Sequence, residues 1–343
     1  MTVDLGIVGA TGVTGEVTLR ILRERGFPVG ELRLFASRRS AGRKIAFGDR
    51  EVTVEALDDG NFAGLDLVIS ATSAALAREW VPRIVEAGPI VIDQSSAFRH
   101  EPGVPLVVPE INADALREHT GIVAGPNCTT AVAVMAVAPL HREVGIRSVI
   151  SSSYQSISGT GRDAILEFLD QTRKATDQVE ALRGREPLDV PEPQVFPKVT
   201  AFNLFPHCET FREGEDTSTE EEKMEAEMRK IFGAPDLVCH ATAVRVPVLV
   251  SHSVSLALEL AHEVSSSRAR ELIGAFPGLR LVDEPWSGRY PTPLDAAGID
   301  EILVGRIRAN PLLGHGISLF ASGDNLRKGN ALNAIQVAEL LVG

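Results

Sequence analysis

The stretch Val3-Asp-Leu-Gly-Ile-Val-Gly-Ala-Thr-Gly-Val-Thr-Gly15 decides the fold of this chain. Val3 to Val8 is an apolar-rich segment of strand length, and Glu16 to Arg25 carries apolar residues at helical spacing. The turn between them holds Gly9, Gly12 and Gly15, which allow a tight bend and a close approach of a pyrophosphate to the helix N-terminus. Glycines also serve ordinary turns, but their place between the first strand and the first helix predicts a dinucleotide-binding domain.

Strand-like and helix-like segments continue to alternate up to the middle of the chain. A helix is expected at Ala74–Ala87, and strands are expected at Glu31–Ser37, Leu65–Ser70, Ile90–Asp93 and Ile122–Ala124. Strands that alternate with helices indicate an α/β fold, a Rossmann-type doubly wound parallel sheet.

The pattern changes after Cys128, and a second, α+β domain is expected there. We expect a Pro-rich connecting loop at Glu186–Pro206, and Val238–Val250 with Ser253–Ala261 resembles two antiparallel strands of a second sheet. The other expected elements are helices at Ala131–Val144, Asp163–Thr176, Glu220–Ile231 and Ala331–Leu341 and strands at Ser148–Gln155, Leu303–Arg308 and Gly316–Ala321. The first domain should therefore span 1–128, completed by a C-terminal helix at 326–343, and the second should span 129–325.

Composition excludes several classes of protein. A chain of 343 residues with 44% hydrophobic content can bury two cores. Its net charge of −12, without a dense Lys/Arg run, argues against a nucleic-acid partner. No apolar run has the length of a membrane span and no signal peptide is evident, so we expect a cytoplasmic protein. Three scattered cysteines and the lack of zinc-ligand spacing argue against disulfides and against a structural metal.

The segment after the second expected strand indicates which cofactor is bound. An NAD site usually carries an acidic residue there for the ribose hydroxyl, whereas this chain has Ser37, Arg38, Arg39 and Ser40. Arginine and hydroxyl groups suit a 2′-phosphate, which favours NADP. The alternative is a solvated basic turn.

Cys128 is the first candidate nucleophile. It follows the strand-like Ile122–Ala124 and precedes an apolar helix, whose free N–H groups can stabilise a thiolate. A small buried packing residue is the alternative, because most free cysteines have that role. The same alternative is preferred for Cys208 and Cys239, although each neighbours a histidine.

Taken together, these segments resemble the aspartate-β-semialdehyde dehydrogenase family, and the resemblance runs in order along essentially the whole chain. Small departures are Gly125 and Thr129 in the cysteine segment, the extra Arg38, and Ser251 where Gly or Ala is usual. The matching segments are Gly9–Gly15, Ser95–Arg99, Pro126–Thr130, Ser153–Gly159, Glu220–Lys223, Arg245–Val248, Ser251–Ser253 and Asp324–Gly329.

The resemblance implies an NADP-dependent, phosphorylating oxidoreductase that interconverts aspartate-4-semialdehyde plus phosphate and aspartyl phosphate. The reaction belongs to the biosynthesis of lysine, threonine, methionine and diaminopimelate. Cys128 is then the nucleophile that forms a thioester, His252 the base, and Gln155 the residue that orients the substrate. On its sequence setting alone, His252 is an ordinary half-buried histidine.

The resemblance also assigns the binding residues. Arg99 and Lys223 are implied phosphate ligands with Asn127 and Ser96 as neutral donors, and Arg245 and Glu220 are implied partners of the α-carboxylate and α-ammonium. A charge at Arg245, in a mostly apolar strand, should be accompanied by a bound carboxylate or an internal acid. The cofactor residues implied are Gly9, Thr11, Gly12, Val13, Gly15, Ser37, Arg38, Arg39, Ser40, Ser158, Gly159 and Asn325. A homodimer or homotetramer through the second domain is implied as well.

Three other functions stay open at this level. A reductase of the same architecture could act on another acyl phosphate, such as N-acetylglutamyl phosphate. A cofactor-free thiol hydrolase or acyltransferase could use Cys128 and His252, but the glycine turn and the arginine-rich turn argue against it. A noncatalytic NADP-sensing regulator is disfavoured by the intact set of reacting groups.

Overall fold

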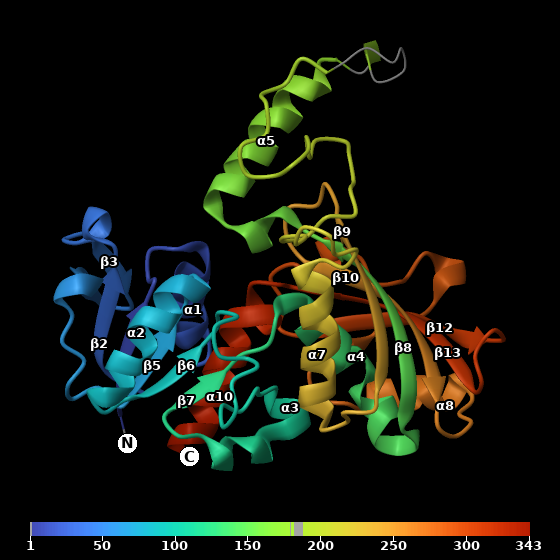
Figure 1. Cartoon of the computed structure of the whole chain (residues 1–343), viewed down its shortest axis with the longest axis horizontal. Coiled ribbons are helices and arrows are strands. Elements are labelled where there is room, and N and C mark those ends of the chain that lie inside the picture. The colour runs from blue at the N-terminus through green and yellow to red at the C-terminus, as the bar shows by residue number, and fades with distance from the viewer. Residues whose placement is uncertain (1, 179, 182–187) are drawn as a thin grey trace. The chain divides into compact units, whose positions relative to one another are not determined.

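The computed structural model describes residues 2–178, 180–181 and 188–343, and it divides into two compact units (Figure 1). Unit 1 comprises residues 1–138, 226–236 and 326–343, and unit 2 comprises residues 139–225 and 237–325. The segment 226–236 therefore belongs with the N-terminal unit, although the sequence places it in the second domain. The two units are described separately below.

Unit 1 is built on a seven-stranded sheet with the strand order β3-β4-β2-β1-β5-β6-β7. All neighbouring strands are parallel except β3, which pairs antiparallel with β4. The strands are β1 (Val3–Val8), β2 (Val29–Ala36), β3 (Lys44–Phe47), β4 (Arg50–Ala56), β5 (Leu67–Ser70), β6 (Ile90–Asp93) and β7 (Ile122–Ala124). Because the chain winds outward from β1 in both directions, the predicted doubly wound parallel sheet is confirmed.

Helices cover both faces of this sheet. Apolar side chains of α1 (Val13–Glu24) and α10 (Leu332–Val342) pack on one face in a single buried cluster, which includes Leu5, Ile7 and Ile92. On the other face α2 (Ala74–Glu86) packs against residues that include Val68 and Val91. Strands that are buried on both faces explain the continuous apolar runs of the sequence.

Unit 2 contains a mixed six-stranded sheet with the order β11-β12-β13-β10-β8-β9. Its strands are β8 (Ile146–Gln155), β9 (Val238–Arg245), β10 (His252–Leu260), β11 (Leu279–Leu281), β12 (Ile302–Asn310) and β13 (Gly316–Gly323). The helices of the second half of the chain are α4 (Cys128–Val144), α5 (Arg162–Thr176), α7 (Thr219–Phe232), α8 (Ser266–Gly274) and α9 (Pro293–Ala296). The expected second α+β domain is confirmed.

The segment from Val238 to Ala261 differs in detail from the expectation. β9 ends at Arg245, before Pro247, whose missing N–H cannot continue a ladder. β9 and β10 do run antiparallel, but β8 lies between them and pairs with both. They are therefore not a hairpin.

One face of this sheet is partly open. Side chains alternate between buried and exposed along β8, as expected for a sheet that is covered on one face. Ile150, Tyr154 and Val238 are exposed on the open face, at 47%, 37% and 63%. These three residues form an apolar strip across β8 and β9.

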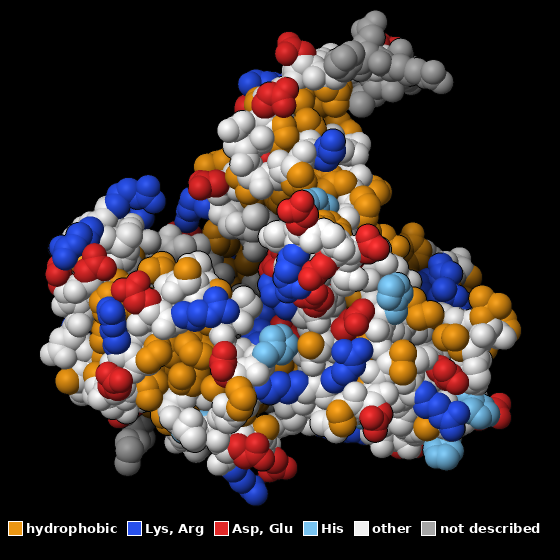
Figure 2. All heavy atoms as spheres, viewed as in Figure 1, with side chains coloured by type: hydrophobic (Ala, Val, Ile, Leu, Met, Phe, Trp, Pro, Cys, Tyr) orange, Lys and Arg blue, Asp and Glu red, His pale blue; other side chains and the backbone are white. Residues whose placement is uncertain are grey.

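Surface charge and helix length bear on the arguments from composition against a nucleic-acid partner and a membrane span. Figure 2 shows Lys and Arg side chains interspersed with Asp and Glu on the face that it draws. Among the described residues, no helix is both long and apolar enough to cross a membrane.

Residues 186 and 187 of the expected Pro-rich loop lie outside the described part of the chain, and the described residues 188–206 contain no helix or strand beyond a single β-bridge at Phe205.

Candidate active site

The glycine-rich turn of unit 1 shows why three of its positions lack a side chain. Gly9 has a φ of +84°, and a Cβ there would lie 2.3 Å from the carbonyl oxygen of Ala71. A Cβ on Gly15, in the first turn of α1, would lie 2.4 Å from the carbonyl oxygen of Gly9. Gly12 is the N-cap of α1 and supplies no capping side chain. The helix N-terminus is therefore left open to an anion.

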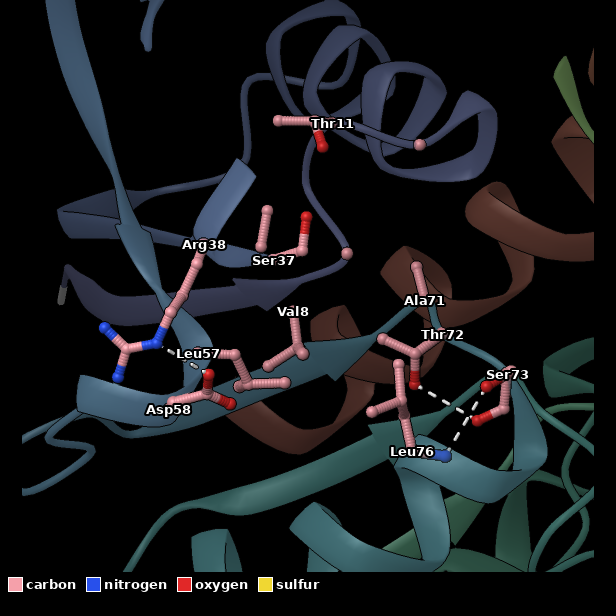
Figure 3. A pocket seen from close by; sticks show the side chains of 13 residues that line it. Val8, Thr11, Ser37, Arg38, Leu57, Asp58, Ala71, Thr72, Ser73 and Leu76 are labelled. Atoms are coloured by element: carbon pink, nitrogen blue, oxygen red, sulfur yellow. Dashed lines mark hydrogen bonds and ion pairs between the residues drawn. The ribbon is translucent and has the colours of Figure 1, made fainter. Parts of the chain in front are cut away.

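A cavity of about 450 Å³ lies at this turn (Figure 3). Its position at the carboxyl ends of β1, β2 and β5 is where ligands bind in open α/β sheets. Hydroxyl groups of Thr11 and Ser37 line it together with the predicted Gly9, Gly12 and Arg38. The remaining lining residues are Val8, Ala36, Leu57, Asp58, Ala71, Thr72, Ser73 and Leu76.

These eight remaining lining residues were not predicted from the sequence, and three of them share one signal. Ala71, Thr72 and Ser73 directly follow β5, the strand next to β1 on the other side of the switch point. Small and hydroxyl residues after the neighbouring strand are the signal that could have found them.

Two of the polar side chains predicted in the basic turn, those of Arg38 and Ser40, already have hydrogen-bond partners within the protein. Arg38 donates to Asp58 at 3.1 Å and to Asp59 at 2.8 and 3.0 Å. Ser40 is buried and its hydroxyl accepts from Thr11 at 3.4 Å. Arg39 is exposed and is not among the lining residues, and Val13 and Gly15 lie on α1.

Cys128 is the first residue of α4, three residues earlier than the predicted start of that helix. The side-chain oxygen of Asn127 accepts from the N–H groups of Thr129 and Thr130, at 2.8 and 3.1 Å. Asn127 therefore has the geometry of an N-cap, which fixes the start of the helix at the cysteine. The half-buried thiol lies at the positive end of the helix dipole, the setting that favours a thiolate.

Arg99, at 6% exposure, lies in the same unit within a buried ion pair. Its guanidinium contacts Glu227 at 3.0 Å, the carbonyl oxygen of Gly125 at 2.9 Å and that of Gln94 at 3.0 Å. The second carboxylate oxygen of Glu227 accepts from the backbone N–H of Asn127 at 2.6 Å. Sequence reasoning missed Glu227, and no local signal points to it. Ser96 is half-buried in the segment that leads to Arg99.

In unit 2, three neighbouring strands bring predicted residues to one end of the sheet. Gln155 and Arg245 are the last residues of the parallel strands β8 and β9, and they are paired in register. His252 begins the antiparallel strand β10 at the same end, since Ser253 is opposite Tyr154. All three side chains are more than 90% buried.

Arg245 has no carboxylate partner among the described residues. Its guanidinium donates to the carbonyl oxygen of Ser156 at 2.5 Å and lies over the ring of Phe196, 5.3 Å from its centre. Its buried Nε has no hydrogen-bond partner. The internal acid that the sequence allowed is therefore not found there, and a buried cation without a counter-ion is costly unless a ligand supplies one.

His252 is a neutral imidazole with a defined tautomer. The backbone N–H of Ser156 donates to its Nδ1 at 2.9 Å, so the proton of the neutral ring is on Nε2. Burial, together with the positive charge of Arg245, lowers the pKa of His252 to about 3. The Nε2 side of the ring faces Gly159, where a Cβ would lie 3.2 Å away.

The predicted cofactor residues of unit 2 gather around Asn325. Its side-chain oxygen accepts from the hydroxyls of Ser156 and Ser158, both at 3.2 Å, and from the N–H of Ser251 at 2.9 Å. Ser251 has a φ of +76°, in the left-handed region that favours glycine. That conformation gives a physical reason for the family's preference for a small residue at this position.

Glu220 and Lys223 lie on α7 with different surroundings. The buried Glu220 accepts from the side-chain nitrogen of Gln155 at 2.8 Å. Lys223 is ion-paired with Glu209, so a phosphate would have to compete with that carboxylate. The described residues contain no group of three or more His, Cys, Asp or Glu side chains that could hold a metal. Cys208 is buried and Cys239 is half-buried.

Comparison with known proteins defines the class. Residues 4–119 match the family model described as semialdehyde dehydrogenase, NAD binding domain, and residues 137–328 match the one described as semialdehyde dehydrogenase, dimerisation domain. A nucleotide-binding Rossmann domain followed by such a second domain makes this chain a semialdehyde dehydrogenase, an oxidoreductase.

The chain belongs to the aspartate-semialdehyde dehydrogenase family. It is 44% identical to the aspartate-semialdehyde dehydrogenase of Mycolicibacterium smegmatis over 99% of both chains. It is 42% identical to that of Aquifex aeolicus over 98% of this chain and 97% of the relative. A crystal structure of aspartate semialdehyde dehydrogenase II from Vibrio cholerae, complexed with ASA, is similar with a TM-score of 0.92 and 36% identity, covering 100% of this chain and 98% of the other.

Proposed function

We propose that this chain catalyses the NADP-dependent interconversion of aspartate-4-semialdehyde plus phosphate and aspartyl phosphate, a step of amino-acid biosynthesis. The observation that carries the substrate assignment is the buried Arg245 without a carboxylate partner. An α-carboxylate would satisfy this guanidinium, and Glu220 supplies the anion for an α-ammonium. A substrate without a free amino-acid end, such as an N-acetylated acyl phosphate, uses this pair less well.

Cys128 is the proposed nucleophile. Its thiolate adds to the aldehyde carbon, which turns the carbonyl oxygen into an alkoxide and forms a tetrahedral adduct. Hydride loss restores the carbonyl as a thioester. Phosphate then attacks the thioester carbon and the thiolate of Cys128 leaves, which releases the acyl phosphate. The position of Cys128 at the N-terminus of α4 stabilises the thiolate both in the first step, where it attacks, and in the last step, where it leaves.

His252 is assigned to the oxygen of the adduct. The sequence predicts a base, but the lone pair of Nδ1 accepts from Ser156 and Nε2 carries the proton. In this form the ring acts as an N–H donor to a developing alkoxide, which lets hydride leave without an imidazolium being formed. The low pKa keeps the ring in this neutral state at pH 7.

Arg99 and Lys223 remain our candidates for phosphate, with Ser96 and Asn127 as neutral donors. Both cations already pair with a carboxylate, Arg99 with Glu227 and Lys223 with Glu209. Phosphate binding thus requires an exchange of partners at each of them. The exchange is electrostatically feasible because a phosphate dianion carries more charge than a carboxylate.

NADP fits the cavity at the glycine turn. Gly9 and Gly15 allow the close backbone packing that forms the turn, and the open N-terminus of α1 suits a pyrophosphate. Arg38 and the hydroxyl of Ser37 suit the 2′-phosphate. When bound, NADP supplies the hydride acceptor, and Ser158, Gly159 and Asn325 remain candidates for its nicotinamide end.

We also propose a homodimer, or a dimer of dimers, in the cytoplasm. The match to a dimerisation domain supports assembly through unit 2, and the apolar strip of Ile150, Tyr154 and Val238 offers a surface for it. The three cysteines are too few and too scattered for a disulfide framework, which suits a reducing compartment. Light scattering of the wild type and of Ile150→Lys tests the assembly, since a monomeric wild type would exclude it.

The decisive experiment follows NADPH formation with aspartate-4-semialdehyde, NADP and phosphate, omitting each in turn. We expect NADPH only when all three are present. The controls are N-acetylglutamate-5-semialdehyde and NAD, which should give much lower rates. Formation of NADPH and free acid without phosphate would indicate a dehydrogenase whose thioester is released by water instead.

A further inference from the structure

The turn that packs against Cys128 is an unusual piece of backbone. Residues Arg327–Ala331 form a π-helical turn immediately before α10, and the N–H of Ala331 donates to the carbonyl oxygen of Leu326 at 3.1 Å. Single π-turns are rare, and their backbone is held only where the surroundings require it.

Gly329, in the middle of this turn, lies against Cys128. A Cβ on Gly329 would lie 3.0 Å from Cβ of Cys128 and 3.3 Å from its Cα and its carbonyl oxygen. A side chain at this position would force Cys128 or the turn to shift by a few tenths of an ångström. The backbone of the turn therefore forms one wall of the position that Cys128 occupies.

A buried ammonium holds the turn in place. Lys328 is 1% exposed, and its Nζ donates to Glu110 at 2.5 Å, to Gln336 at 2.7 Å and to Asn333 at 3.1 Å. Gln336 also donates to the other oxygen of Glu110, at 2.9 Å. The network ties the turn to α3 (Pro109–Asn112) and to α10, and the side chains of its ion pair are 2% exposed at Lys328 and 10% at Glu110.

Burying such a charged network costs desolvation free energy that apolar packing does not. A buried ion pair loses its hydration, and apolar residues of similar volume often give equal or greater stability. What the pair adds is directionality, since a charge with three oxygen acceptors admits one arrangement of the turn. The residue next to it in sequence is the one that touches Cys128.

We propose that Lys328 is a positioning residue for Cys128: with Glu110 it locks the π-turn so that the Gly329 backbone fixes the orientation of the thiol. The proposal rests on the proposed role of Cys128 as nucleophile.

The test separates positioning from stability. Lys328→Met removes the cation that pairs with the largely buried Glu110, so it lowers stability as well, whereas Lys328→Met with Glu110→Gln removes both charges. We expect the double variant to melt near the wild type yet to lose about 10- to 100-fold in kcat. KM values should stay within about twofold. Arg25→Met is the matched control, because it removes another cation bound to α10, at Glu339, away from the turn.

A second readout follows the thiol without turnover. Alkylation of Cys128 by iodoacetamide, measured by mass spectrometry across pH, reports the thiol pKa and its access. In the double variant and in Gly329→Ala we expect slower alkylation and a shifted midpoint, and in Arg25→Met a wild-type profile. Gly329→Ala keeps the charge network, so it decides the matter if the Lys328 variants do not fold.

A wild-type kcat and alkylation profile in the double variant and in Gly329→Ala would overturn the proposal. Cys128→Ser distinguishes the two levels of failure. If it retains turnover, the proposed function has failed at its nucleophile. If it is inactive while the Lys328 and Gly329 variants behave as wild type, only the positioning role has failed.

Discussion

Arg245 and His252 are joined through the backbone of one residue, Ser156. The carbonyl oxygen of Ser156 accepts from the guanidinium of Arg245, and the N–H of the same residue donates to Nδ1 of His252. The backbone of Ser156 thus fixes the Arg245 guanidinium, which has no carboxylate partner among the described residues, relative to the neutral His252 ring with its proton on Nε2. A ligand that binds Arg245 is held in a set geometry toward the imidazole N–H.

Arg245→Met should raise KM for the semialdehyde by about 100-fold, because a buried charge-assisted contact to the α-carboxylate is lost. kcat should fall much less. The pKa of His252 should also rise, since the positive charge that helps to lower it is removed. Steady-state kinetics and NMR titration measure the two effects. Arg147→Met, an exposed position on β8, is the control, and an unchanged KM in Arg245→Met would refute the substrate assignment.

Acid should destabilise unit 2 through His252. Its pKa is about 3 when folded and about 6.5 when unfolded, so the unfolded state binds more protons between these values. The stabilisation is complete above pH 6.5 and is lost as pH falls toward 3, by up to about 1.4 kcal/mol per pH unit. Urea unfolding at pH 7.5, 5.5 and 4.5 measures this slope.

His252→Gln should flatten that slope, and substitution of the exposed His262 by Gln should not. Equal slopes in all three proteins would mean that other groups dominate the acid limb.

Ser251 offers a test of backbone strain. At its φ of +76° glycine is favoured over alanine, so Ser251→Gly should be more stable than Ser251→Ala by about 1 kcal/mol. Both variants also remove a buried hydroxyl that has no hydrogen-bond partner. At Ser253, which has no positive φ, the order should reverse. Thermal melting of the four variants decides, and the same order at both positions would argue against strain.

Asp58 and Asp59 should reduce the affinity for NADP, because they compete with a 2′-phosphate for Arg38. Replacing both by Asn should tighten NADP binding by about 3- to 10-fold and leave NAD binding unchanged. Arg38→Ala should weaken NADP binding alone. Calorimetric titration measures both, with Glu51→Gln as a control that breaks the exposed pair with Lys44. If the Asp variants tightened the binding of NADP and NAD equally, the effect would come from the overall charge of the cavity and not from the release of Arg38 for the 2′-phosphate.

The elements that the sequence predicted well are those with strong local signals. The turn at Gly9 is set by a strand, glycines and a helix within 25 residues, and the structure realises it with a cavity at that place. The hairpin of β3 and β4 was missed because it is an edge element with charged residues such as Lys44, Arg50 and Glu51 on its exposed sides, so its strands lack an apolar pattern.

The parts of the site that were missed depend on long-range contacts. Glu227 pairs with Arg99 across 128 positions of the chain, and a helix of alternating charges gives no reason to select it. The start of α4 at Cys128 could have been read from Asn127, whose side chain is a preferred N-cap. Periodicity of apolar residues begins only at Ala131, which is why the prediction placed the start there.

Glu227 uses its two oxygens for different tasks, one on Arg99 and one on the N–H that precedes Cys128. A phosphate that bound Arg99 as proposed, and drew it away from Glu227, would leave this carboxylate uncompensated next to the segment that carries Cys128. Negative charge there disfavours the thiolate and favours its acylated, neutral form. The arrival of phosphate would then change the charge beside the sulfur before any bond is made, and the order of substrate binding would depend on the charge of Glu227.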